Sequence, residues 1–357
     1  MTKRTARVLA GLVIWVVACP AGGVRGLAAQ SLSFDDAVKL FQEKKWAEAA
    51  PAFEQIETAQ PNQTDALLYE GKCLANLGRF SDADSVLVRY VGAHPKSNDA
   101  TALLAYIRFR ENKPKDSLQL FTAAAALQTP SADDLKIVAL DYVLLNDYDD
   151  AGRYLEIALQ MAPLNVEARY HLGRVRYQQN RFDEAIAAFQ QVLRLDPDNV
   201  KAENNLGLSL EAENQVEPAL AAYRKAIDLD RAAAAGIHTE QPYLNLGVLL
   251  GKSNRPAEAV SPLTLAAQIT PKSGKLHYEL GKIYFTLNQF ENARHELETS
   301  VQLDDGSRES HFLLGRTYQR LGKADLAAKE FKTTEQLIHN QDAGSGGMSS
   351  APPPGLQ

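Results

Sequence analysis

The segment most suggestive of nucleotide chemistry is residues 247–253, which read GVLLGKS. A loop that cradles phosphates has the pattern GxxxxGK[ST], in which backbone N–H groups and the lysine bind phosphate oxygens. Here only Val248, Leu249 and Leu250 stand between the two glycines, one residue fewer than the pattern needs. The segment also has helical periodicity, so we expect a helix there and no phosphate site.

Histidine and cysteine, the usual metal ligands and nucleophiles, are few and scattered. Two cysteines are too few for a disulfide framework or a cysteine-rich zinc module. His277 and His311 occupy equivalent positions on neighbouring helices, and a helix-packing distance of about 10 Å is too long for them to share one metal ion. Cys73 is expected to be a small buried side chain within a helix. We therefore predict no enzyme active site, no cofactor and no metal.

A period of 34 residues runs through most of the chain. Units begin at residues 30, 64, 98, 132, 166 and 200, and after one slip of six residues at 240, 274 and 308. Each unit contains two apolar patterns of helical period separated by a turn such as Leu77-Gly78-Arg79. The repeat predicts an all-α stack of about nine helix–turn–helix hairpins, because a single hairpin cannot bury its own apolar face.

Two small residues recur in every unit, and we number positions from the start of each unit. Position 8 is always Gly or Ala, and position 20 is Ala, or Ser at Ser117. Position 24 is always a large apolar residue, such as Phe189 or Leu263. We expect positions 8 and 20 to mark the close approach of the two helices, where a larger side chain would cost about 1–3 kcal/mol.

This pattern resembles the tetratricopeptide repeat (TPR) family, through the Leu-Gly pairs that end at Gly173, Gly207, Gly247, Gly281 and Gly315. Asp36 and Glu70 depart from it at position 7, where Leu is usual. The resemblance implies an α-solenoid that forms a right-handed superhelix with a concave face built from the first helices. It also implies a protein that binds other proteins and is not an enzyme.

By the same resemblance, positions 5, 9, 12 and 13 should line the concave groove, with asparagines at position 6. At positions 5, 9, 12 and 13, eight residues are basic and only Glu211 is acidic, which favours an acidic peptide segment or a free carboxylate as the ligand. The predicted groove residues are Lys72, Arg110, Lys136, Tyr170, Arg174, Tyr177, Asn205, Asn245, Lys252, Tyr278, Lys282, Arg316 and Arg320.

Residues 1–29 have the character of a bacterial export signal. Lys3, Arg4 and Arg7 precede an apolar run at residues 8–17, which is shorter than the roughly 20 residues that span a bilayer. Small residues near residue 28 suit cleavage by a signal peptidase. Alternatively, residues 16–19 (VVAC) resemble a lipobox, in which residues 1–18 would be removed and Cys19 lipidated. A third alternative is that the segment stays uncleaved as an anchor. All three interpretations place the protein in the periplasm or cell envelope.

These features define the expected organisation of the chain. A signal segment (1–29) precedes units one to six (30–233), an insertion (234–239), units seven to nine (240–341) and a disordered Gly/Ser/Pro tail (342–357). The alanine run before the insertion should extend the second helix of unit six. The formal charge of −6 gives no reason to expect nucleic acid as a partner.

Two functions fit this organisation. The first is a non-enzymatic scaffold of the cell envelope that binds a peptide or protein segment in its groove. The second is a lipid-anchored assembly factor of a secretion, pilus or outer-membrane complex, with Cys19 as the only link to the membrane. Repeat-bearing enzymes carry a separate catalytic domain, for which this sequence leaves no room beyond the repeats.

Overall fold

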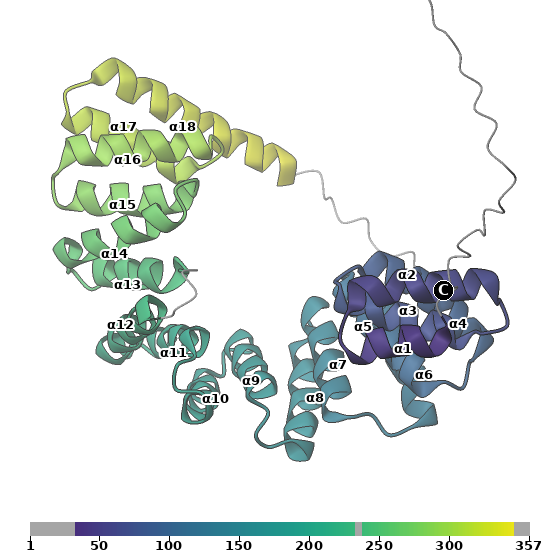
Figure 1. The fold of residues 1–357 in the computed structure, drawn as a ribbon. Coiled ribbons are helices and arrows are strands. Elements are labelled where there is room, and N and C mark those ends of the chain that lie inside the picture. Colours follow the sequence, from purple (N-terminus) through teal and green to yellow (C-terminus); the bar gives the residue numbers. More distant parts are fainter. Residues whose placement is uncertain (1–32, 233–237, 346–357) are drawn as a thin grey trace, which may run out of the picture. The chain divides into compact units, whose positions relative to one another are not determined.

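A computed structural model describes residues 33–232 and 238–345, which form helices joined by short turns and contain no strand (Figure 1). The all-α prediction is therefore confirmed. The first helices of the hairpins are α1 (Phe34–Gln42), α3 (Asp65–Asn76), α5 (Asn98–Arg110), α7 (Ala132–Leu144), α9 (Val166–Gln178), α11 (Val200–Ala212), α13 (Gln241–Lys252), α15 (Gly274–Thr286) and α17 (Arg308–Arg320). The second helices are α2 (Trp46–Ala59), α4 (Phe80–Ala93), α6 (Pro114–Leu127), α8 (Tyr148–Met161), α10 (Phe182–Leu195), α12 (Val216–Ala232), α14 (Pro256–Ile269), α16 (Phe290–Leu303) and α18 (Ala324–Ser345).

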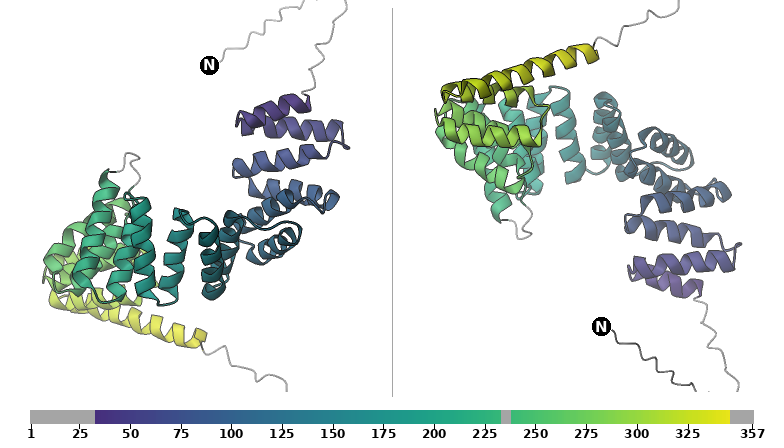
Figure 2. Two further views of the ribbon diagram at one scale, coloured as in Figure 1. Left: turned by 90° about the horizontal axis from the view of Figure 1, so that it is seen from below. Right: turned by 90° about the horizontal axis from the view of Figure 1, so that it is seen from above.

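The chain forms two compact units that meet at residues 93 and 94. The first contains α1–α4 and the second contains α5–α18. Within each unit, the second helix of one hairpin packs on the first helix of the next, as α2 does on α3 and α10 on α11. First helices also touch one another along α9, α11, α13, α15 and α17. Figure 1 shows α13–α18 as successive layers, and Figure 2 gives two further views of them.

The small residues at positions 8 and 20 lie where the helices of each hairpin meet, as predicted. Every residue at these positions is buried. An ideal Cβ built on any of the six glycines at position 8 would lie only 2.4–2.8 Å from the side chain at position 24 of the same hairpin. The large residue at position 24 therefore occupies the space above the glycine, and the pair forms the core of the hairpin.

The turn inside each hairpin has one geometry that the sequence analysis did not anticipate. Position 15 has a positive φ, between 57° and 73°, in all nine hairpins of residues 33–232 and 238–345. Asparagine and glycine tolerate this left-handed conformation, and they fill eight of the nine positions. The following N–H donates to the carbonyl of position 11 at 2.8–2.9 Å, as in Arg79 to Leu74. This hydrogen bond closes the first helix and directs the chain into the second.

Lys44 is the exception, since its side chain has no special tolerance for the φ of 58°. We expect Lys44→Gly to raise the free energy of unfolding of the first unit by about 0.5–1 kcal/mol, because a left-handed L-residue is strained. Urea unfolding followed by the fluorescence of Trp46 measures the effect. Lys45→Gly is the matched control and should not stabilise, since Lys45 has a φ of −82°. Equal stabilisation by both variants would contradict the explanation.

Three boundaries differ from, or refine, the sequence expectation. The first helix of unit one begins at Phe34, whereas the unit was expected to begin at residue 30. α12 has 17 residues where most second helices have 14, and it ends at Ala232, the first residue of the alanine run. The other alanines of the run lie outside the described residues. α18 continues to Ser345, which corrects the prediction that the disordered tail starts at residue 342. The predicted export signal, most of the insertion and the rest of the tail lie outside the described residues.

Candidate functional site

The segment that resembled a phosphate loop is helical, as expected. Gly247 lies within α13, and its backbone packs against the Leu263 side chain. The N–H of Ser253 donates to the carbonyl of Leu249 at 2.9 Å, so this N–H closes the helix instead of facing a ligand.

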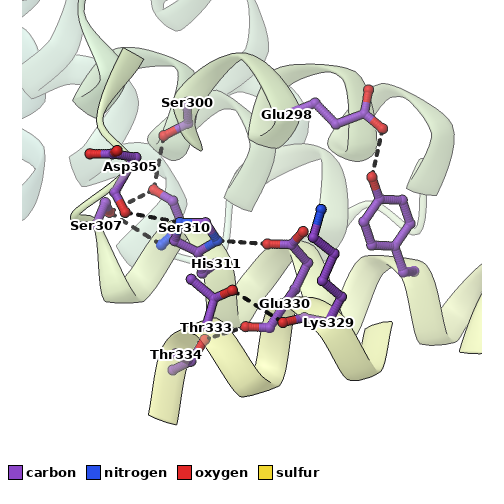
Figure 3. A network of polar contacts seen from close by, with 11 residues as sticks. Glu298, Ser300, Asp305, Ser307, Ser310, His311, Lys329, Glu330, Thr333 and Thr334 are labelled. Carbon is purple, nitrogen blue, oxygen red and sulfur yellow. Dashed lines mark hydrogen bonds and ion pairs between the residues drawn. The ribbon is translucent and has the colours of Figure 1, made fainter. Parts of the chain in front are cut away.

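His277 and His311 form the same polar bridge in successive hairpins. His311 Nδ1 lies 2.6 Å from the carboxylate of Glu330 on α18, and Nε2 lies 3.1 Å from the carbonyl of Asp305 (Figure 3). His277 makes the equivalent contacts with Glu296 and the carbonyl of residue 271. Each ring therefore ties its helix to the rest of the stack. Within residues 33–232 and 238–345, no group of His, Cys, Asp or Glu side chains is arranged to hold a metal ion.

Cys73 is completely buried, as the sequence analysis expected. Burial raises the pKa of its thiol to about 12, with a smaller contribution from the nearby Glu70 carboxylate. A thiol that stays protonated at neutral pH is a poor nucleophile. Cys73 is therefore a packing residue of α3.

A cavity of the second unit lies over four consecutive first helices, α9, α11, α13 and α15, and we call it the central pocket. Its volume is about 520 Å³. It brings together four of the predicted groove residues, and every lining residue is on a first helix. The lining consists of Tyr177, Leu208, Glu211, Ala212, Leu244, Asn245, Val248, Lys252, Lys275, Glu279 and Lys282.

The central pocket combines apolar side chains with paired charges. Leu244 is buried, while Leu208 and Val248 are half-buried and contribute apolar surface. Lys252 Nζ lies 2.9 Å from Glu211 Oε1 across α13 and α11, and Lys282 Nζ lies 3.1 Å from Glu279 Oε2. Two of the three lysines are thus neutralised by carboxylates. The pocket is close to charge balance, which differs from the strongly basic groove that the sequence predicted.

Lys275 supplies the remaining charge of the pocket. It is exposed at the start of α15, and in the described part of the chain it makes no ion pair or hydrogen bond. Lys275 occupies position 2 and Glu279 occupies position 6, neither of which the sequence analysis counted as charged groove positions. Position 2 is three residues before position 5, and position 6 is three residues before position 9. Residues three apart lie on the same face of a helix, so Lys275 and Glu279 face the groove as well. That spacing is the signal that would have revealed them.

A smaller cavity of about 70 Å³ lies on α7, α8 and α9 and is lined by His171 and Arg174. Burial, together with the charge of Arg174, lowers the pKa of His171 to about 4, so this ring is neutral at physiological pH. Arg174 is exposed and has no ion pair within the described residues. It is therefore a cation that remains available to a ligand.

The two predicted groove asparagines at position 6, Asn205 and Asn245, are occupied by contacts inside the protein. Asn205 Nδ2 donates to the Tyr170 hydroxyl at 3.0 Å and to the carbonyl of Lys201 at 2.7 Å. Asn245 Nδ2 donates to Asn204 Oδ1 at 2.9 Å. Burial raises the pKa of Tyr170, against the opposing effects of Arg174 and Asn205. These amides fix neighbouring first helices to each other.

Lys136 is a correction to the predicted groove set. Its side chain is only 11% exposed, and Nζ lies 2.7 Å from Glu167 and 3.1 Å from Asp133. Both acids sit at position 2 of their units, which the sequence analysis did not count. A buried ammonium with two carboxylate partners ties α7 to α9 and offers no charge to a ligand.

The other predicted cations lie against aromatic rings. Lys72, in the first unit, lies 5.7 Å from the ring centre of Tyr69. Arg110 lies 5.6 Å from that of Tyr106. In the C-terminal hairpins, Lys282 lies over Tyr278 at 5.8 Å, Arg316 over Phe285 at 4.9 Å and Arg320 over Phe290 at 4.3 Å. Such stacking fixes the position of each cation. Lys282 is in addition paired with Glu279.

No helix in the described ranges is long and apolar enough to span a bilayer.

Comparison with known proteins extends these observations. The sequence is 31% identical over 93 residues to the rhomboid protease GluP of Bacillus subtilis; this stretch is 26% of the chain but only 18% of GluP, so the chain spans less than a fifth of that relative. A tetratricopeptide repeat protein from Parabacteroides merdae matches 71% of the chain and 98% of its own length, with a TM-score of 0.55 and 17% identity. The Cut9–Hcn1 complex of the APC/C matches 82% of the chain and 57% of its own length, with a TM-score of 0.55 and 15% identity. These structures share the fold.

Two family models, both described as tetratricopeptide repeat, match the sequence itself. One matches residues 139–200, 172–235 and 278–337, and the other matches residues 40–107. The matches fall in both compact units and together cover more than half of the chain. The hairpins, the small residues at positions 8 and 20 and these matches agree, and the chain belongs to the tetratricopeptide repeat family.

Proposed function

We propose that this protein is a non-enzymatic scaffold of the cell envelope that binds a peptide segment of a partner protein in the central pocket. The repeat architecture is that of a protein–protein interaction scaffold. The observation that carries the proposal is the central pocket itself. Its volume of about 520 Å³ falls within the range of about 300–1,000 Å³ that is typical of ligand sites.

The composition of the pocket suits a peptide. Leu208, Leu244 and Val248 provide an apolar surface for one side chain of the ligand. Beside it, Lys275 provides a donor for carbonyl or carboxylate groups. The Lys252–Glu211 pair at the rim can exchange partners with a charged peptide group, because both members are accessible. This combination of an apolar centre and a polar rim is that of a specific interface.

The envelope location is supported by the character of residues 1–29. A basic start, a short apolar run and small residues near residue 28 favour export. Lipidation at Cys19 remains the alternative, in which the same scaffold would be tethered to a membrane as an assembly factor. The intact mass of the exported protein distinguishes an acylated Cys19 from cleavage near residue 28.

A variant that fills the pocket tests the binding function. Ala212 is an exposed helical residue that lines the pocket, so Ala212→Trp should occupy the cavity without disturbing the core. Peptides selected from a random library on the wild-type chain should bind this variant at least about tenfold more weakly, because the indole excludes the apolar anchor. Fluorescence anisotropy with a labelled selected peptide measures the change.

Ala187→Trp is the matched control for this experiment. Ala187 is also an exposed helical alanine, but it lies on the second helix α10, away from the pocket lining. It should bind the selected peptides as the wild type does. Equal binding by Ala212→Trp and the wild type, or no selectable peptide at all, would refute the pocket as the binding site.

A further inference from the structure

Two arginines and two phenylalanines form a compact cluster beside the central pocket, and we call it the arginine–phenylalanine cluster. Arg316 and Arg320 lie one turn apart on α17. Arg316 stacks on Phe285 of α15, and Arg320 stacks on Phe290 of α16. The two rings lie 5.6 Å apart and are inclined at 70°, so they also support each other. One face of each guanidinium group therefore packs on a phenylalanine ring, which holds the group in place.

Neither guanidinium is neutralised by an acid. Arg316 has no ion pair or hydrogen bond in the described residues, and Arg320 has only a 3.5 Å contact with Asn288 Oδ1. Arg294 on the nearby second helix α16 differs, since it lies 2.8 Å from Glu291 and 3.4 Å from Glu298. The cluster thus combines fixed geometry with unused charge.

The spacing of the two arginines defines what they can bind. Residues four apart on a helix are separated by a rise of about 6 Å. Side chains two apart on an extended peptide are separated by about 6.5–7 Å on the same face. A stacked guanidinium still presents its N–H edge, which matches a carboxylate in a bidentate fashion. Two carboxylates at alternate positions of an extended peptide therefore match the two arginines.

We propose that the arginine–phenylalanine cluster binds an acid-x-acid motif, in which two Asp or Glu residues flank any residue, in an extended peptide. This inference rests on the proposed function and specifies the partner, because the cluster adjoins the central pocket. Lys282 lines the pocket at position 9 of α15, and Arg316 occupies position 9 of the neighbouring α17. The motif lies beside the residue that the same peptide places in the pocket.

A small probe tests the cluster independently of the pocket. The peptide Ac-Glu-Gly-Glu-NH2 is titrated into the full chain, and the Nε–Hε signals of the arginines are followed by NMR. Arg316 and Arg320 should shift together and saturate, and Ac-Gln-Gly-Gln-NH2 should leave them unchanged. The proposal is overturned if the probe leaves both signals in place, or if inorganic phosphate at the same concentration shifts them as strongly as the diacid.

Variants test the contribution of the cluster to the whole peptide. Selected peptides that contain the motif should bind Arg316→Gln/Arg320→Gln at least about tenfold more weakly, since hydrogen bonds to charged groups are lost. Arg316→Lys/Arg320→Lys retains the charge but loses the planar fork, so it should recover only part of the affinity. Arg194→Gln is the control, because Arg194 is an exposed arginine on the second helix α10 without a partner in the described chain.

The outcomes separate this inference from the proposed function. If wild-type selections yield peptides without paired acids, and Ala212→Trp still abolishes their binding, the pocket stands and the acid-x-acid inference fails. If the diacid probe binds the cluster but no peptide depends on Ala212, the cluster stands and the pocket function fails. Full recovery of affinity by the double lysine variant would show that simple charge suffices, and would overturn the bidentate site.

Discussion

Gly247→Val is expected to lower the free energy of unfolding by about 3 kcal/mol, at the upper end of the cost of overpacking. An ideal Cβ on Gly247 would lie 2.4 Å from Cγ and 2.8 Å from Cδ2 of Leu263, closer than real contacts allow. Leu263 is completely buried, so it cannot swing into solvent to make room. The branched valine would therefore separate α13 from α14 in the centre of the second unit.

Urea unfolding monitored by circular dichroism measures this loss. Gly92→Ala is the control, because an added Cβ at Gly92 meets nothing within 4 Å and the residue is exposed on α4. That variant should be more stable by about 0.5–1 kcal/mol, since alanine favours helix. Leu263→Ala combined with Gly247→Val should lose less than the sum of the two single changes, because each relieves the other. A stable Gly247→Val protein would show that positions 8 and 24 are not in close contact.

The hairpins themselves were predictable because the constraint that builds them is local and repeated. Small residues at positions 8 and 20 and a large one at position 24 specify how two helices meet, and the spacing is visible in the sequence. The turn at position 15 was visible in the same way, since Asn112, Asn146, Asn180 and Asn214 recur every 34 residues. A residue type that tolerates a left-handed backbone, repeated at one position, indicates a helix end.

The candidate site was less predictable, because charge pairing depends on neighbouring helices. The sequence predicted that Lys252 and Lys282 line the groove, and both line the central pocket. The same prediction counted their charges as unpaired. Glu211 reaches Lys252 across 41 residues of sequence, and Glu167 reaches Lys136 across 31. Such pairs form only when the stacked helices bring the side chains together. Aromatic stacking of Arg316 and Arg320 likewise depends on packing between hairpins.

An acidic residue at position 10 of the fourth hairpin makes the stability of the protein depend on pH. Position 10 is apolar in most hairpins, as at Val175 and Leu249, but it is Asp141 in α7. Position 20 is Ser only at Ser117 on the preceding α6, and its hydroxyl donates to Asp141 Oδ2 at 2.5 Å. Asp141 is completely buried, and its Oδ1 has no hydrogen-bond partner. The acid and the serine are thus a matched pair in an otherwise apolar interface.

Burial raises the pKa of Asp141 from 3.8 to about 7, although the Ser117 hydrogen bond acts in the opposite direction. No charged group on α5, α6 or α8 contributes to this shift. The folded protein therefore keeps this carboxyl protonated at pH values where the unfolded chain has already released the proton. The resulting stability is complete below about pH 4 and is lost as the pH rises towards 7, by about 4 kcal/mol at 1.36 kcal/mol per pKa unit.

Asp141→Asn is therefore expected to be more stable than the wild type at about pH 8, and the advantage should disappear at about pH 4. The double variant Asp141→Val/Ser117→Ala, which restores the apolar pair of other hairpins, should gain at least as much at high pH. Urea unfolding at a series of pH values measures both. Asp198→Asn, at an exposed aspartate, serves as the control and should show no such trend.

The quantity to compare is the difference in unfolding free energy between Asp141→Asn and the wild type, because Asp141 is not the only buried acid with a raised pKa. Glu70 is buried in the first unit, and burial together with Glu54 and Glu57 raises its pKa to about 7 as well. The wild type alone would thus lose stability with rising pH for two reasons. Subtracting the Asp141→Asn curve cancels the contribution of Glu70 and leaves that of the α6–α7 interface. A pH-independent difference between the two proteins would mean that the pKa of Asp141 is not raised in the folded state.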